Sequence, residues 1–175
     1  MTDRRYPIGP FVPQESYTEE ELTELIATIE SAPSAYRELA ANFSEEDLAK
    51  TYREGSWTVQ QLIHHVADIH LVHFFRMKKA LTESDYKEVT LINMDGWVNT
   101  PEANFYPVED SLAAFESIGN RYVYLAKNLT SEQLDIAYFH PVRQIWISQK
   151  NALAMSAWHV KHHFAHIELA LGILE

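Results

Sequence analysis

The chain has 175 residues, which is the size of one domain and is long enough to bury a sizeable core. Its formal net charge of −11 argues against nucleic acid or an anionic membrane as a partner, because both favour basic surfaces. The absence of cysteine excludes disulfides, thiolate metal ligands and a cysteine nucleophile. No apolar run is long enough to span a membrane and no secretory leader is visible, so we expect a cytoplasmic protein.

Five glycines and seven prolines leave long uninterrupted segments, which favours helices over a sandwich with many turns. Residues 1–16 contain three of the prolines and predict an N-terminal arm that packs on the rest of the chain. Residues 17–175 are then expected to form a single helical domain.

Two capping boxes mark helix starts in the first half of the chain. Thr18, with a glutamate three residues later, begins the first helix, which we expect Pro33 to interrupt. Thr58, with a glutamine three residues later, begins a second long helix that runs to about Leu81.

The long connection over residues 82–106 is the least regular part of the sequence. Connections of this length inside a compact domain usually have a function, and we expect a short helix near 93–98. A third helix is predicted from Pro107 to about Asn128. Residues 138–148 are too aromatic and β-branched for a good helix, and they predict an extended crossover or a short hairpin.

The last predicted helix, over about 149–174, carries four histidines within eight residues. Its apolar stripe consists of Leu153, Ala157, Val160, Phe164, Ile167 and Leu171. At about 100° per residue, His159 and His163 lie together on one shoulder of this stripe. His162 is expected to point to solvent, and His166 lies just beyond the shoulder. The first pair therefore has the geometry of a helical bis-histidine metal site.

A third ligand would have to come from the second long helix. His65, His70 and His73 all lie on or beside its apolar stripe, and the angular position alone does not choose among them. His64 projects away from the stripe and is expected to be solvated. On the residues alone, a bundle without metal, in which these histidines are satisfied at the edge of the core, is the alternative.

Several segments resemble the DinB/YfiT-like family of four-helix metalloproteins. They are Tyr6-Pro7-Ile8-Gly9-Pro10-Phe11, Gly55-Ser56-Trp57-Thr58, Leu62-Ile63-His64-His65-Val66-Ala67-Asp68, Phe139-His140-Pro141 and Ala157-Trp158-His159-Val160-Lys161-His162-His163. The resemblance covers nearly the whole chain and implies an all-α, DinB-like four-helix bundle with long connections. It also implies that the helices run up-up-down-down, with the two histidine-bearing helices facing each other, and that His65, His159 and His163 are the metal ligands.

Three imidazoles leave an open coordination position, which is typical of catalytic sites, and zinc or nickel suits imidazole best. Family members resemble either metal-dependent hydrolases or S-transferases that use a low-molecular-weight thiol such as bacillithiol. The resemblance therefore implies a metal-dependent enzyme with a small-molecule substrate, and a homodimer. No H-E-x-x-H glutamate is present to serve as a general base, which slightly favours metal-activated thiol chemistry, or a metal-bound hydroxide that needs no separate base. A non-catalytic metal-binding stress-response bundle is the alternative function.

Two further residues are candidates for catalysis. His140 can orient a substrate, or it can be an ordinary loop residue beside a proline. Arg76 can hold an anionic substrate, or it can form a surface salt bridge. Asp68 is interpreted as a residue that faces solvent or another helix.

Overall fold

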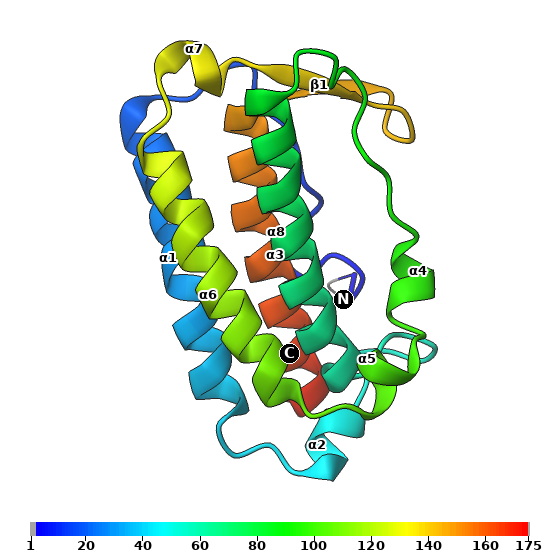
Figure 1. Ribbon diagram of the computed structural model, residues 1–175. Coiled ribbons are helices and arrows are strands. Elements are labelled where there is room, and N and C mark those ends of the chain that lie inside the picture. The colour runs from blue at the N-terminus through cyan, green and yellow to red at the C-terminus, as the bar shows by residue number, and fades with distance from the viewer. Residues whose placement is uncertain (1–2, 175) are drawn as a thin grey trace.

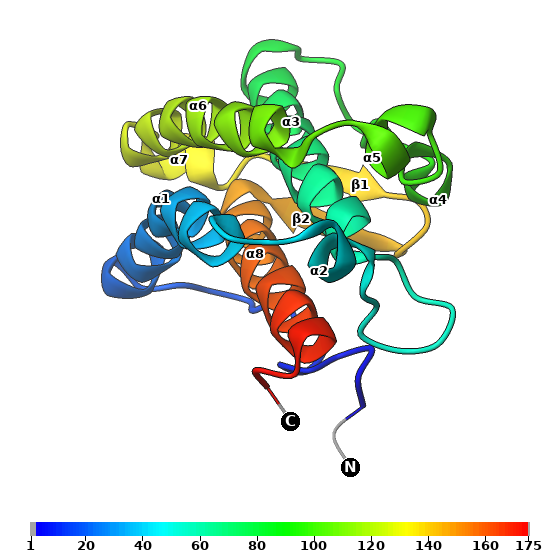
Figure 2. The same ribbon diagram turned by 90° about the horizontal axis from the view of Figure 1, so that it is seen from below.

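Four long helices form the body of the molecule in the computed structural model, which describes residues 3–174 (Figure 1). They are α1 (Glu19–Ala40), α3 (Val59–Thr82), α6 (Val108–Lys127) and α8 (Gln149–Leu171). Both α1 and α3 pack against α6 and α8, so that the four helices form a ring when seen from below (Figure 2). The predicted all-α four-helix bundle is therefore confirmed. Residues 1–2 of the predicted arm and residue 175 of the predicted domain lie outside the described part.

The directions of the helices differ from the expected up-up-down-down order. In Figure 1, α1 and α8 run downwards, whereas α3 and α6 run upwards. The short connection over 41–58, which includes α2 (Glu45–Ala49), turns the chain back at the bottom. The connection over 83–107 then runs from the top to the bottom, so that α6 begins at the same end as α3. This long return makes α3 and α6 parallel neighbours.

The helix starts follow the capping signals in the sequence. The Thr18 hydroxyl accepts a hydrogen bond from the Glu21 backbone N–H at 3.1 Å, and the side chain of Glu21 accepts one from the Thr18 N–H at 2.7 Å. Thr58 forms the same box at the start of α3. The expectation that Pro33 interrupts the first helix was wrong, because α1 continues through it. Pro33 is buried against Gly119 of α6, where an added Cβ would lie 3.3 Å from Pro33 Cγ.

The long connection contains α4 (Met94–Trp97), which was predicted, and α5 (Pro101–Phe105), which was not. The predicted crossover after α7 (Ser131–Leu134) is a hairpin of strands β1 (Ala137–His140) and β2 (Ile145–Ser148). The connection is joined to this hairpin, because Val89 N–H donates to the Phe139 carbonyl at 2.9 Å. The hairpin lies at the end of the bundle where α3 ends and α8 begins, and the connection leads away from that end (Figure 1).

The N-terminal segment packs along α8. The indole N–H of Trp158 donates to the Gly9 carbonyl at 3.0 Å, and the Phe11 ring lies 6.1 Å from the Trp158 ring. Further up, the amide of Asn151 exchanges hydrogen bonds with the backbone of Gln14. Residues that precede the first helix therefore cover the outer side of the helix that carries most of the histidines.

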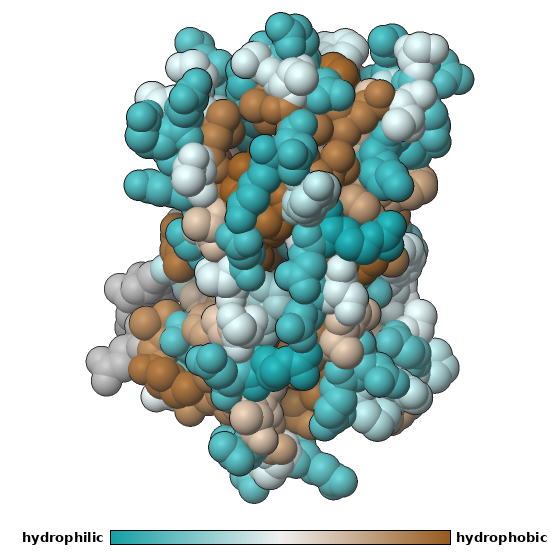
Figure 3. All heavy atoms as spheres, turned by 60° about the vertical axis from the view of Figure 1, so that its left-hand side comes forward, coloured by the Kyte–Doolittle hydropathy of each residue, from teal (hydrophilic) through white to brown (hydrophobic). Residues whose placement is uncertain are grey.

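The core lies between the four helices, and Phe115 and Tyr122 of α6 are its largest fully buried side chains. Hydrophilic side chains cover most of the face on the α1 side, with apolar groups visible between them (Figure 3). Among the described residues, no helix has the length and apolar character needed to cross a membrane.

Candidate metal centre

Three histidines from two helices meet in the interior of the bundle. His65 comes from the second turn of α3, and His159 and His163 come from the middle of α8. One ring nitrogen from each lies within 4.8 Å of one from both others, and the two Nε2 atoms of His65 and His159 are 3.2 Å apart. His65 and His163 are buried, whereas His159 is half-buried. The arrangement therefore keeps one side of the group open.

The 3.2 Å between Nε2 of His65 and Nε2 of His159 fits two ligands of a tetrahedral metal ion. Two imidazole nitrogens at the usual zinc distance and a tetrahedral angle lie about 3.3 Å apart. Burial is the main cause that lowers the pKa of His65 to about 3, and it also holds the pKa values of His159 and His163 well below 6.5. The three imidazoles are therefore neutral near pH 7, the form in which histidine binds a metal ion.

His166 extends the group on the side away from His65. Its Nδ1 lies 3.3 Å from Nδ1 of His163, so one of these two nitrogens donates to the other. The His166 ring is also stacked on Tyr52 at 3.9 Å between centroids. Because His163 Nδ1 is engaged in this contact, Nε2 is the nitrogen that remains for a metal ion.

The expectation that His162 points to solvent was wrong. The residue is buried, and its ring stacks on Trp158 at 4.2 Å and faces Tyr6 of the N-terminal segment at 6.0 Å. The helical angle placed it correctly on the outer face of α8, but the N-terminal segment covers that face. With His163 and His166 it forms a second group in which the ring nitrogens lie within 4.8 Å of one another.

The other two candidate ligands of α3, His70 and His73, contact other partners. His70 faces α6, where its ring meets Phe115 at 4.8 Å and Tyr122 at 5.3 Å. His73 lies beside the triad, with its ring 5.8 Å from that of His159. Its Nδ1 is 2.8 Å from the hydroxyl oxygen of Ser156.

The hydroxyl of Ser156 determines which nitrogen of His73 carries the proton. It lies 2.9 Å from the Ala152 carbonyl, which can only accept, and 3.0 Å from the Tyr122 hydroxyl. All three contacts are hydrogen bonds only if Ser156 donates to Ala152 and accepts from both Tyr122 and His73. His73 then carries its proton on Nδ1 and presents Nε2 as an acceptor.

The expectation that His64 is solvated was also wrong. The residue is buried, with Nδ1 2.8 Å from the Ser111 hydroxyl and Nε2 3.0 Å from the Tyr106 carbonyl. The end of the long connection covers this face of α3, which the helical angle could not reveal. Asp68, one turn further, is half-buried, and burial raises its pKa to about 6, with the charge of Glu102 acting in the same direction.

The two candidate catalytic residues lie at the hairpin end of α3. Arg76 is buried, and its Nε and Nη2 donate to the Thr90 carbonyl at 3.1 and 2.8 Å, so it does not form the surface salt bridge considered as its alternative. His140 ends strand β1, is half-buried, and accepts the Arg143 backbone N–H on Nδ1 at 3.3 Å. Burial is the largest cause that lowers the pKa of His140.

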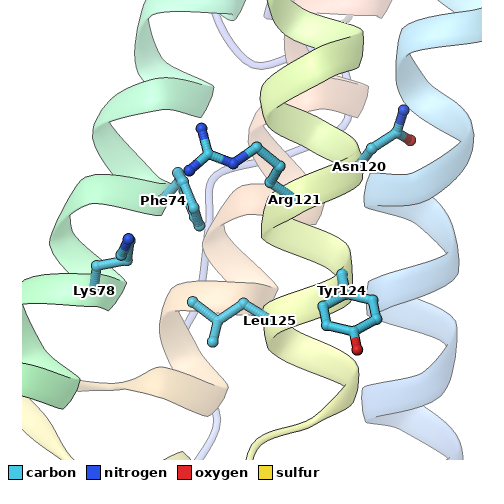
Figure 4. Close-up of a pocket in the computed structure, with 6 residues that line it drawn as sticks. All are labelled: Phe74, Lys78, Asn120, Arg121, Tyr124 and Leu125. Carbon is cyan, nitrogen blue, oxygen red and sulfur yellow. The ribbon is translucent and has the colours of Figure 1, made fainter.

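A separate hollow of about 380 Å³ lies between α3 and α6, and its lining residues are shown in Figure 4. Its two cations flank one aromatic ring, since Lys78 Nζ and Arg121 Cζ lie 5.5 and 5.1 Å from the Phe74 centroid. No histidine or carboxylate lines this hollow, so we propose no catalytic role for it.

A pH dependence of stability follows from the burial of His70. Burial lowers its pKa in the folded protein to about 4, below the ordinary value of 6.5, so the unfolded chain binds a proton first as the pH falls. The contribution of His70 to stability is therefore complete above pH 6.5 and is lost on acidification. For metal-free protein, we expect His70→Leu to flatten the pH dependence of the unfolding free energy by ~1 kcal/mol per pH unit between about pH 6 and 4.5. Urea unfolding at several pH values measures both slopes, and equal slopes would contradict the prediction.

The fold and the site together define a helical bundle with a histidine cluster able to hold a metal ion. Residues 28–167 match the profile of the DinB superfamily, and the chain belongs to that superfamily. The resemblance seen in the sequence is therefore confirmed.

Two relatives match almost from end to end. The one from Oceanobacillus iheyensis is 40% identical over 170 residues, which cover 97% of this chain and 96% of the relative. The one from Halalkalibacterium halodurans is 41% identical over 169 residues, with 97% of each chain covered. Both bear the name "Putative metal-dependent hydrolase".

Solved structures show the same architecture. YfiT from Bacillus subtilis, a protein with an unusual four-helix bundle topology, superimposes with a TM-score of 0.92 at 31% identity, with 97% of each chain covered. A mycothiol-dependent maleylpyruvate isomerase superimposes with a TM-score of 0.54 at 17% identity, covering 83% of this chain and 60% of the other. The second likeness shows the fold alone.

Proposed function

We propose that the protein is a metal-dependent enzyme in which His65, His159 and His163 bind one divalent ion, zinc or nickel, through their ring nitrogens. The observation that carries the proposal is the convergence of three neutral imidazoles from two helices, with ring nitrogens within 4.8 Å of one another and one pair 3.2 Å apart. Three protein ligands leave a position for water or substrate, which is the pattern of catalytic sites.

Helix packing and a neighbouring histidine orient the proposed ligands. Antiparallel packing of α3 against α8 sets the two helices face to face, and His166 holds the His163 ring by its Nδ1 contact. Trp57 covers the cluster, with its ring 4.7 Å from that of His65. A divalent ion bound here supplies Lewis acidity at its open position, where it can lower the pKa of a water molecule or a thiol.

Hydrolysis is the first candidate reaction, because the similar relatives are named for it. Transfer of a low-molecular-weight thiol to an electrophile is the second. The observation that favours the second is that, among the described residues, the grouped metal-ligating side chains include no carboxylate that could act as a general base. A bound ion would lower the pKa of a thiol, so that the thiol would release its proton to water without such a base.

Metal content tests the shared part of the proposal. Protein purified without a nickel column is expected to contain, or to take up, close to one equivalent of zinc or nickel, measured by plasma mass spectrometry. No uptake of either ion would overturn it.

The cobalt-substituted protein separates the two reactions. For a thiol transferase, addition of a small thiol should produce a sulfur-to-cobalt charge-transfer band, and turnover should require the thiol. For a hydrolase, ester or amide turnover should proceed without any thiol. A bundle that binds metal, gains thermal stability from it and turns over neither substrate class would be the non-catalytic alternative. The homodimer and the cytoplasmic location stay predictions, and sedimentation velocity tests the first.

A further inference from the structure

Arg76 is a buried cation without a counter-charge. It is only 9% exposed, and none of the ion pairs among the described residues includes it. Arginine is almost never buried without a paired anion, because removal of the charge from water is costly. In a chain with a net charge of −11, the lack of a carboxylate partner at this position is unusual. Part of the guanidinium therefore remains to be paired by a group from outside the chain.

The hydrogen bonds of Arg76 show which part remains. Its Nε and Nη2 both donate to the Thr90 carbonyl, which occupies one edge of the planar group. Nη1 has no partner in the described part of the chain, and it is not sealed off from solvent. The free edge therefore presents parallel N–H groups from Nη1 and Nη2, the geometry that binds a carboxylate or a phosphate through two hydrogen bonds.

Other polar side chains face the region between α3 and the hairpin, where the free edge of Arg76 lies. On a helical projection, His65, His73 and Arg76 lie within an arc of roughly 80° on one face of α3. Tyr138 and His140 alternate with Phe139 along β1, so they share one face of the hairpin. The hydroxyl of Tyr138 is unpaired among the described residues but is still accessible, although the residue is 4% exposed.

A second arginine acts on Arg76. Burial is the main cause that lowers the pKa values of Arg76, His73 and His140. The positive charge of Arg143, at the tip of the hairpin, lowers them further. None of the ion pairs among the described residues brings a carboxylate to Arg76, His73 or His140. The charged side chains described beside Arg76 are therefore cationic, in a protein with a net charge of −11.

Arg76 lies close to the candidate metal centre along α3. The His73 ring is 5.8 Å from that of His159, and Arg76 follows His73 by one turn of α3, about 4.5 Å along the helix axis. A small organic molecule is long enough to reach both.

From these contacts we propose that Arg76 binds an oxyanion, a carboxylate or phosphate group of the substrate, between α3 and the hairpin and with the help of Arg143. The inference rests on the proposed function for its link to a reaction, but the anion site itself is independent of the metal. The substrate of the metal centre is accordingly a small anion whose charged end points toward the hairpin and whose reacting end points toward the three histidines.

The test is an anion titration of metal-free protein, followed by the NMR signals of the backbone and of the Arg76 Nε–H, for which weak binding suffices. Succinate and inorganic phosphate serve as separate probes and distinguish a carboxylate site from a phosphate site. We expect at least one of them to shift these signals saturably, and Arg76→Gln to raise its Kd at least tenfold. Arg143→Gln, on the exposed hairpin tip, should raise the Kd severalfold at low salt.

Two control variants show whether the change in Kd belongs to the proposed anion site. Lys78→Gln removes a cation from the other side of α3 and should leave the Kd unchanged. His163→Ala, which removes a proposed metal ligand, should change the Kd of the anion by no more than about twofold. Anion binding can therefore be tested even if the three histidines bind no metal. The proposal is overturned if neither anion binds the wild-type protein, or if Arg76→Gln binds as tightly as wild type. Should Arg76→Gln fail to fold, an unchanged Kd in Arg143→Gln overturns it.

Discussion

Replacement of His65 by alanine is expected to release the metal ion. The variant removes the only proposed ligand from α3 and leaves two imidazoles on α8, which cannot hold a divalent ion against water with comparable strength. We expect the affinity to fall by more than about 100-fold, the upper limit observed when only an outer hydrogen-bond partner of a ligand is lost. Equilibrium competition with a chromogenic chelator measures this change.

Two other histidines of α3 provide matched controls. His70→Leu and His73→Gln should keep the metal within about tenfold of the wild-type affinity, because His70 faces α6 and His73 is held by Ser156. These were the alternatives that the helical angle left open. If His73→Gln released the metal and His65→Ala did not, the ligand set proposed for α3 would be wrong.

Truncation of Phe115 is expected to have the largest effect on stability. Its side chain is 1% exposed at the centre of α6, and it meets the rings of Tyr36 from α1 and His70 from α3 edge-on, at 5.5 and 4.8 Å. Phe115→Ala leaves a cavity among three helices, so the free energy of unfolding should fall by about 3–5 kcal/mol. Chemical denaturation monitored by circular dichroism measures the difference.

A surface aromatic of the same helix serves as the control. Tyr124 is 73% exposed, and Tyr124→Ala should change the free energy of unfolding by less than about 0.5 kcal/mol. Phe115→Leu, which fills most of the volume, should cost less than Phe115→Ala. A loss below about 1 kcal/mol for Phe115→Ala would mean that α6 is not packed as described.

Features that depend on neighbouring residues could be predicted from the sequence. The boxes at Thr18 and Thr58 mark helix starts because their hydrogen bonds close within three residues. Likewise, the spacing of His159 and His163 places both rings on one side of α8 without reference to the rest of the fold. The choice of His65 came from the resemblance to a family, and the structure places this residue with the other two.

Features that depend on distant segments could not be predicted in this way. His162 and His64 were expected in water because a helical projection shows only where a side chain points. The first is covered by the N-terminal segment and the second by the end of the long connection. The directions of the helices follow from the path of that connection, which its irregular composition does not specify. Pro33 is accommodated within α1, where it packs against a glycine of another helix.

The order in which the helices pack has a consequence for folding. α1 packs mainly on α6 and α8 rather than on α3, the long helix that follows it in the chain. During synthesis the apolar face of α1 therefore lacks its main partners until α6, at residues 108–127, is available. Because contacts between distant segments form slowly, we expect folding to be slower than in bundles built from helical hairpins. Since α8 brings two of the three proposed ligands, metal uptake should report the completion of folding.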